Sequence, residues 1–190
     1  MRLVLALTGA SGAVYGLRTL DALTALGHEV HLVPSRAFET VLRHETGKSL
    51  VELREKAAAI YREEDTSAPP ASGSFQHDGM AVVPCSLKTL AAIAHGYADN
   101  LVTRAAMTCL KERRRLVLVT RETPLDLITI RNMEAVTEAG GTILPASPGF
   151  YHQPKDVGEL VDHVVGKTLD QLNVPHDLFA RWRGLPEPPG

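Results

Sequence analysis

Short apolar runs alternate with amphipathic segments along most of the chain. Residues 2–7 and 29–34 are strand-length apolar runs, and each is followed by a segment with helical spacing of its apolar residues, at 13–26 and 36–46. A glycine, Gly27, closes the first of these helical segments, as glycine commonly does. The order strand, glycine-rich turn, helix, strand is typical of the first half of a doubly wound parallel sheet.

The same alternation continues to the end of the chain. Further strand-like runs cover residues 80–84, 116–120 and 142–145, and helix-like patterns cover residues 87–95, 101–113, 128–139 and 157–172. Residues 48–74 are less regular and are interpreted as a helical piece followed by a mobile loop. Strands that alternate with helices predict a single α/β domain with a parallel sheet covered on both faces.

Composition and charge narrow the functional classes. The 190 residues carry a formal net charge of −2, with 44% hydrophobic and 22% charged residues. This balance gives no basic surface for nucleic acid or an anionic membrane, and no apolar run is long enough to span one. Two cysteines make neither a disulfide framework nor a metal-binding spacing. Because no signal-peptide pattern precedes the first strand, we expect a cytoplasmic protein.

A glycine-rich turn, Thr8-Gly9-Ala10-Ser11-Gly12, follows the first strand. Small residues at a helix N-terminus let backbone N–H groups approach an anion, so a phosphate cradle is favoured over a turn made only for packing. The turn lacks the G-x-G-x-x-G spacing of dinucleotide sites, and the second strand ends at Ser35 rather than at an acidic residue. Ser35-Arg36 keeps an NADP enzyme open as a weaker alternative.

A second turn, Pro84-Cys85-Ser86-Leu87-Lys88-Thr89, joins a strand directly to a helix. Ser86 is a plausible N-cap, and the pattern fits a simple cap and a ligand-binding turn about equally well. Cys85 is expected to be buried filler rather than a nucleophile, because no activating histidine lies near it in sequence.

Charged and aromatic side chains supply the remaining candidates. Arg104 and Lys111 are seven residues apart on one helical face, where a solvated surface is the usual interpretation. Arg121-Glu122 follows a buried strand at its carboxyl end, which favours anion binding by Arg121 and proton transfer by Glu122. Tyr151 and Lys167 are both able to bind a phosphate monoester, although each alone is more often structural.

An ordered set of motifs resembles the UbiX-type flavin prenyltransferases. The matching stretches are Thr8–Ala13, Ser72–Ser74, Pro84–Thr89, Arg104–Ala106, Leu110–Glu112, Leu116–Leu125, Pro148–Tyr151 and Ala180–Trp182. They run in order over residues 1–184, so the resemblance implies one flavoprotein domain followed by a short tail, residues 185–190. It implies a flavodoxin-like sheet and reduced FMN bound between the subunits of a homododecamer.

The resemblance also implies a reaction. A dimethylallyl group passes from dimethylallyl monophosphate to N5 and C6 of reduced FMN, without a metal, and a UbiD-type decarboxylase uses the prenylated product. The implied FMN contacts are Gly9, Ala10, Ser11, Ser35, Ser86, Leu87, Lys88, Thr89 and Arg121. The implied phosphate ligands are Arg104, Lys111, Tyr151 and Lys167, where several relatives carry Arg at the last position. Glu45 and Glu122 match the acidic residues near the reacting groups, and Trp182 is either a shield for the allyl group or a packing anchor.

Two alternatives remain open at this stage. A phosphopantothenoylcysteine- or peptidyl-cysteine-decarboxylase-like flavoenzyme typically has Pro-Ala-Ser-Ala-Asn-Thr where this chain has residues 84–89. It also needs a catalytic histidine, which is not identified among His28, His31, His44 and His77. A non-catalytic flavin-binding subunit of an aromatic-acid decarboxylase is the other alternative.

Overall fold

Six parallel strands form one sheet in the order β3-β2-β1-β4-β5-β6. The strands are β1 (Arg2–Leu7), β2 (Glu29–Pro34), β3 (Ala59–Ile60), β4 (Gly79–Cys85), β5 (Arg115–Thr120) and β6 (Thr142–Pro145). The computed structural model describes residues 1–184. Chain order runs outward in both directions from the β1–β4 pair, which makes this pair the topological switch point of a doubly wound sheet, as the sequence pattern predicts.

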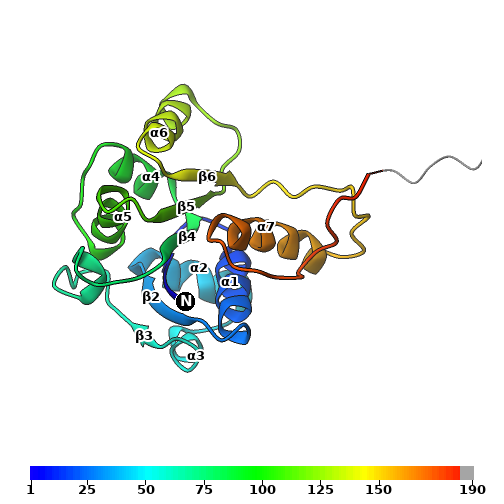
Figure 1. The fold of residues 1–190 in the computed structure, drawn as a ribbon, viewed down its shortest axis with the longest axis horizontal. Coiled ribbons are helices and arrows are strands. Elements are labelled where there is room, and N and C mark those ends of the chain that lie inside the picture. The colour runs from blue at the N-terminus through cyan, green and yellow to red at the C-terminus, as the bar shows by residue number, and fades with distance from the viewer. Residues whose placement is uncertain (185–190) are drawn as a thin grey trace, which may run out of the picture.

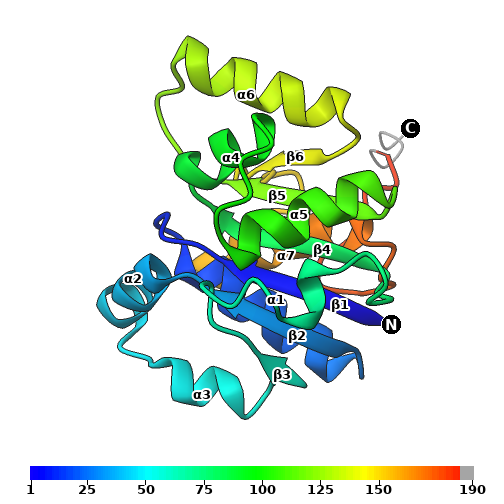
Figure 2. The ribbon, with the colours of Figure 1, turned by 90° about the vertical axis from the view of Figure 1, so that its left-hand side faces the viewer.

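Helices cover both faces of the sheet (Figures 1 and 2). They are α1 (Ala13–Ala25), α2 (Arg36–Thr46), α3 (Leu50–Arg54), α4 (Leu87–Ala94), α5 (Leu101–Lys111), α6 (Leu127–Glu138) and α7 (Val157–Gln171), with a short 3-10 helix at Pro69–Ala71. Side chains of α1 and α7 share one hydrophobic cluster, and those of α4 and α5 share the other. The two helix pairs therefore lie on opposite sides of the sheet.

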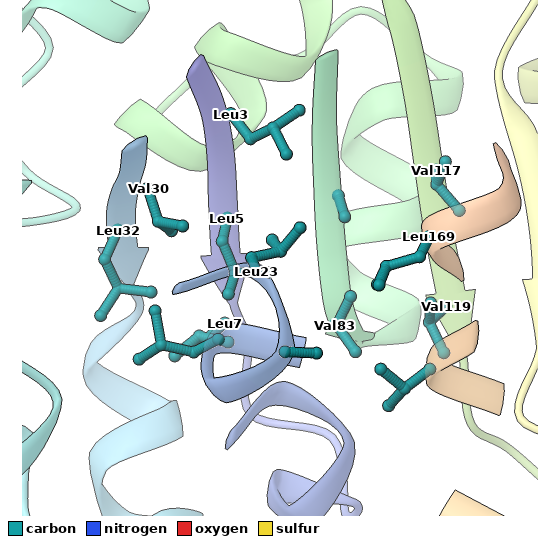
Figure 3. Close-up of a cluster of buried hydrophobic side chains, with 14 of the residues drawn as sticks. Leu3, Leu5, Leu7, Leu23, Val30, Leu32, Val83, Val117, Val119 and Leu169 are labelled. Carbon is teal, nitrogen blue, oxygen red and sulfur yellow. The ribbon is translucent and has the colours of Figure 1, made fainter. Parts of the chain in front are cut away.

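Alternation along each strand divides the core between these two clusters. Leu3, Leu5 and Leu7 of β1 point into the α1–α7 cluster, whereas Val4 and Ala6 point into the α4–α5 cluster. Figure 3 shows the first cluster, in which leucines and valines of neighbouring strands meet Leu23 and Leu169. Each fully buried leucine or valine contributes about 1.5–3 kcal/mol relative to an exposed one.

Most helices begin at a polar residue whose side chain accepts a backbone N–H. Ser35, Ser86, Asn100, Asp126 and Asp156 cap α2, α4, α5, α6 and α7 in this way. The predicted N-cap at Ser86 is therefore confirmed. Helix α1 differs because its N-cap residue is Gly12, which has no side chain to supply a cap.

The segment between α2 and β4 differs from its prediction. It contains the predicted helical piece, which is α3, but also the two-residue strand β3, which was not predicted, and its loop is hydrogen-bonded to a distant part of the chain. Arg114 donates to the carbonyl oxygens of Gly73 and Phe75 at 2.6 and 2.8 Å, and Phe75 packs against the α4–α5 cluster. A two-residue strand is too short to show a periodic pattern of apolar residues. A hydrogen-bond donor such as Arg114, about 40 residues further along the chain, cannot be recognised from the local sequence.

A projecting arm is formed by residues 146–156, which join β6 to α7, and residues 175–184, which follow α7. In Figure 1 both segments extend away from the sheet along α7. The predicted tail, residues 185–190, lies outside the described residues. Within residues 1–184, no helix is long and apolar enough to cross a membrane.

Candidate functional site

The turns after β1 and β4 are joined to each other at the switch point. The hydroxyl of Thr8 donates to the carbonyl oxygen of Pro84 at 2.7 Å and accepts the N–H of Ser86 at 2.8 Å. Thr8 is buried, so these bonds are shielded from water. The predicted glycine-rich turn and the predicted Pro-Cys-Ser turn consequently form one continuous ledge at the carboxyl edge of the sheet.

Two glycines of the first turn are required by geometry. Gly12 has φ 109°, a left-handed conformation that disfavours side chains, and it places the first N–H groups of α1 toward the sheet edge. A Cβ on Gly9 would lie 2.5 Å from the Cβ of Ala37 at the start of α2. The turn thus serves close packing and also exposes backbone donors, so the two interpretations of the motif do not exclude each other.

A carboxylate from α2 occupies the N-terminus of α1. Glu45 accepts the N–H of Gly12 at 3.0 Å and that of Ala13 at 2.8 Å. Burial alone would raise the pKa of Glu45, but hydrogen bonds from the Ser11 hydroxyl and from these two amides hold it below its usual value. The helix terminus was predicted to cradle a phosphate, and in this chain the carboxylate of Glu45 accepts its first N–H groups instead.

Arg121 lies beside this helix terminus. Its charge acts on both Glu45 and Tyr15, and its Cγ is 3.9 Å from the position that a Cβ on Gly12 would take. The Nε atom of Arg121 is buried and has no hydrogen-bond partner among the described residues. Since buried guanidinium donors are rarely left unpaired, this atom points to a missing acceptor, such as an oxygen of a ligand.

Glu122 faces solvent next to Arg121. Its carboxylate accepts the N–H of Thr123 at 3.0 Å, and it makes no ion pair within residues 1–184. An exposed carboxylate on the loop that follows β5 is available for proton exchange with a group bound at the ledge.

The second turn of the ledge combines a cap with exposed polar groups. The Ser86 hydroxyl donates to Thr89 Oγ1 at 3.0 Å and accepts the N–H of Thr89, while Lys88 is exposed. Burial raises the pKa of the Cys85 thiol to about 12, so Cys85 is neutral at physiological pH. This agrees with its prediction as buried filler.

Ser35 lies at the next strand end and borders a hollow of about 510 Å³. The walls of the hollow come from the ends of β2 and β3 and from α2 and α3, with Arg36, Arg54 and Arg62 among them. Its volume suits a small-molecule ligand. Of the residues predicted to contact FMN, only Ser35 lines this hollow. The other predicted contacts lie at the ledge or beside it, so the ledge is the better candidate for the functional site.

The four predicted phosphate ligands fall into two groups in this chain. Arg104 and Lys111 are exposed on α5, and Lys111 Nζ lies 3.6 Å from Glu112. Tyr151 precedes α7 and Lys167 belongs to it. Because α5 and α7 cover opposite faces of the sheet, one chain does not bring these four side chains together.

Tyr151 and Trp182 meet on the projecting arm. Their rings pack edge to face with centroids 5.7 Å apart, and Trp182 remains 57% exposed. Lys167 Nζ lies 3.4 Å from Asp170, whose carboxylate also binds Arg181 through two contacts of 2.7 Å. The Arg181 bonds hold the pKa of Asp170 at about 2. The contact with Tyr151 agrees with the interpretation of Trp182 as a packing anchor, and the exposed part of its side chain leaves the second interpretation open.

Several neighbours of these residues were not predicted. Tyr15, Asp170, Arg181 and the stacked imidazoles of His152 and His163 are contacts across turns or between segments. The adjacency of Arg181 to Trp182 and the four-residue spacing of His163 and Lys167 were the available signals. Within residues 1–184, no three histidine, cysteine or carboxylate side chains cluster as metal ligands would.

Comparisons with known proteins agree with this geometry. The family model "Flavoprotein" matches residues 1–169. A probable UbiX-like flavin prenyltransferase of Bacillus subtilis is 48% identical over 190 residues, which covers 100% of this chain and 93% of that protein.

Solved structures extend the similarity to three dimensions. AnUbiX (PadA1), crystallised with FMN and dimethylallyl pyrophosphate, is 47% identical, with a TM-score of 0.95 over 97% of this chain and 98% of its own. A dodecameric FMN-dependent UbiX-like decarboxylase of Escherichia coli O157:H7 is 44% identical, with a TM-score of 0.94 over 97% of this chain and 100% of its own.

Proposed function

The chain belongs to the UbiX-type flavin prenyltransferases of the flavoprotein family, and from this we propose that it transfers a dimethylallyl group from dimethylallyl monophosphate to N5 and C6 of reduced FMN. The observation that carries the proposal is the ledge at the switch point, where Arg121 Nε and the α1 N-terminus converge. Full-length identity near 50% to a flavin prenyltransferase favours this transferase over a cysteine decarboxylase.

The ledge fits FMN. Gly9, Ala10 and Ser11 line the first turn, Ser86, Leu87, Lys88 and Thr89 line the second, and Ser35 and Arg121 flank them. The buried Nε of Arg121, which has no partner among the described residues, suits an electron-rich, oxygen-bearing ligand. A similar protein that binds FMN has a TM-score of 0.95 to this chain, which supports the same cofactor here.

We place the substrate phosphate between subunits. Arg104 and Lys111 of one subunit would face Tyr151 and Lys167 of another, because α5 and α7 lie on opposite faces within one chain. Exposure of Arg104, Lys111, Tyr151 and Lys167 in the single chain supports this arrangement. A homododecamer, as in the similar E. coli protein, supplies such neighbours.

The chain's own residues account for the demands of the reaction. Reduced FMN, when bound, supplies the nucleophilic atoms and stabilises developing positive charge. The phosphate leaves as a dianion when the allylic C–O bond breaks, and three cationic side chains with the Tyr151 hydroxyl would stabilise it without a metal ion. Glu122 would give a proton to the departing phosphate, and Trp182 would cover the allyl group with its π face.

Glu45 has a separate task in this scheme. Its carboxylate neutralises the α1 N-terminus and lies in the field of Arg121, so it keeps the ledge polar and ordered before substrate arrives. Its lowered pKa keeps Glu45 ionised at neutral pH, so it would act on the reacting groups through its negative charge and not as a general acid. We further propose that the protein is cytoplasmic and that its prenylated FMN serves a UbiD-type decarboxylase.

Product analysis tests the proposal directly. Purified protein, reduced FMN and dimethylallyl monophosphate should yield a flavin whose mass is increased by one dimethylallyl group, with and without a chelator. FAD and NADP should not replace FMN. An unchanged flavin mass with FMN still bound would instead support the non-catalytic accessory subunit, and activity that required added magnesium would contradict the metal-free scheme.

A further inference from the structure

Two stacked imidazoles lie beneath Tyr151 on the projecting arm. The rings of His152 and His163 are 5.3 Å apart and inclined by only 4°, and Tyr151 packs edge-on against both at 5.4 and 5.7 Å. His163 belongs to α7 and lies one helical turn before Lys167, so the pair contacts one of the assigned phosphate ligands and neighbours the other.

The ring nitrogens of this pair are poorly satisfied. His163 Nδ1 accepts the N–H of Gly149 at 3.2 Å, so a neutral His163 carries its proton on Nε2. Both ring nitrogens of His152 are buried and have no hydrogen-bond partner within residues 1–184. Buried polar atoms of this kind normally have a partner, so the unsatisfied nitrogens indicate a ligand that the single chain does not contain.

We propose that the His152–His163 pair is a protonatable part of the subsite that binds the substrate phosphate, and that the pair takes up one proton when the phosphate dianion binds. The inference rests on the proposed function and adds two residues to its phosphate site. It names a property, proton uptake from solvent, that the four assigned ligands do not have.

Electrostatics around the pair give the direction of the effect. Burial lowers the pKa of His163, and the nearby His152 and Lys167 lower it further, which favours the neutral form of His163 before substrate binds. Tyr151 packs against both imidazoles, and Phe179 packs on His163 and separates it from His176 and Arg181, which bind Asp170. A dianion next to Tyr151 and Lys167 would reverse the local field and favour an imidazolium.

Aromatic packing alone is the competing interpretation. His163 also touches Phe179 at 4.9 Å, and a phenyl ring at position 163 would preserve every ring contact. If packing were the whole role, then His163→Phe would leave anion binding and its pH dependence unchanged. This substitution keeps the ring contacts but also removes the acceptor of the Gly149 N–H, so the loss of the pH dependence, and not weaker binding alone, separates the two interpretations.

The test uses sulfate, a tetrahedral dianion that does not titrate near neutral pH, with the full-length FMN-loaded protein. Calorimetry in buffers of different ionisation enthalpy measures both affinity and proton uptake. From about pH 6 to 8 the wild-type affinity should fall by as much as about tenfold per pH unit, with uptake of close to one proton. The apparent KM for dimethylallyl monophosphate should rise over the same interval.

Variants decide the outcome. The doubly substituted His152→Asn, His163→Phe protein should bind sulfate more weakly at pH 6, with no proton uptake and a flat pH profile. His95→Asn, at the exposed C-terminal end of α4, is the matched control and should retain the wild-type profile. FMN content and oligomer size show whether each variant has folded.

A pH-independent wild-type affinity, no sulfate binding, or a pH dependence that survives in the double variant would overturn the inference. None of these outcomes depends on turnover. If the wild-type protein prenylates FMN but gives one of these three outcomes, only the proposed role of the histidine pair is contradicted. If the protein does not modify FMN, the proposed function itself is contradicted.

Discussion

The ledge and the projecting arm differ in how many of their polar groups find hydrogen-bond partners within one chain. At the ledge, Thr8, Ser86 and Glu45 are bonded to groups of the same chain, and Arg121 Nε is the conspicuous exception. On the arm, Trp182 is largely exposed, and neither ring nitrogen of His152 has a hydrogen-bond partner among residues 1–184. The ledge thus forms its hydrogen bonds within the subunit, whereas the proposed function places a ligand and a neighbouring subunit at the arm.

This contrast assigns different tasks to the two regions. In the proposed function, the preorganised ledge would hold the flavin without rearrangement, because its polar groups are already fixed by bonds within the chain. The arm presents cations and aromatic rings outward, where a second subunit can add Arg104 and Lys111. The division predicts that ledge variants impair chemistry or folding, and that arm variants impair phosphate capture.

The largest expected effect concerns Glu122 at the ledge. Glu122→Gln keeps size and hydrogen bonding but removes proton transfer, so turnover should fall by roughly 10²–10⁴-fold. FMN content and the KM for dimethylallyl monophosphate should change little. Steady-state product formation checks this, with the exposed Glu55→Gln as control. Wild-type turnover in Glu122→Gln would leave Glu122 without a role in proton transfer.

Subunit mixing tests whether the phosphate ligands of α5 and α7 come from different chains. Arg104→Ala and Lys167→Ala each remove a charge-assisted bond to phosphate, which costs about 1.5–3 kcal/mol and lowers kcat/KM roughly 10–100-fold. Co-assembly of the two variants in equal amounts should restore about a quarter of the sites, because one site in four combines an intact Arg104 with an intact Lys167 from different chains. No recovery in mixed oligomers would place both residues in the site of a single chain.

Two glycine substitutions compare the rigidity of the regions. Gly9→Ala at the ledge would set a methyl group 2.5 Å from Ala37 Cβ, so unfolding should become about 1–3 kcal/mol easier. Gly149→Ala on the arm would meet only the rings of Tyr151 and His163 at 3.2–3.4 Å, and these side chains can shift. Denaturant unfolding of both variants should show the larger loss for Gly9→Ala, and equal losses would contradict the contrast.

The smallest effect is a pH dependence of the arm. Since Asp170 has a folded-state pKa of about 2, below its unfolded value, its stabilisation is present above the unfolded pKa near 4 and disappears as pH falls toward about 2. Asp170→Asn should lower Tm slightly at pH 7 and match the wild type near pH 2. Thermal melts across pH 2–7 check this. A difference that persists unchanged at pH 2 would attribute the loss to packing.

Much of the fold was predictable because its signals are local. Strands at Arg2–Leu7, Glu29–Pro34 and Thr142–Pro145 match their predicted bounds, since a buried strand is a short apolar run between polar turns. Ser86 was identifiable as a cap from its place between strand and helix. Strand β3 was missed because two residues are too few to show a period.

The sequence by itself determined which segments form strands and helices and which polar residues follow the strands at one edge of the sheet. Periodicity and capping depend on neighbours a few residues apart, so one chain read in order suffices for them. The tertiary structure decided that Glu45 binds the α1 N-terminus from 32 residues away and that α5 and α7 take opposite faces. Periodicity shows that a face is buried but not which element buries it, and only packing in three dimensions settles that choice.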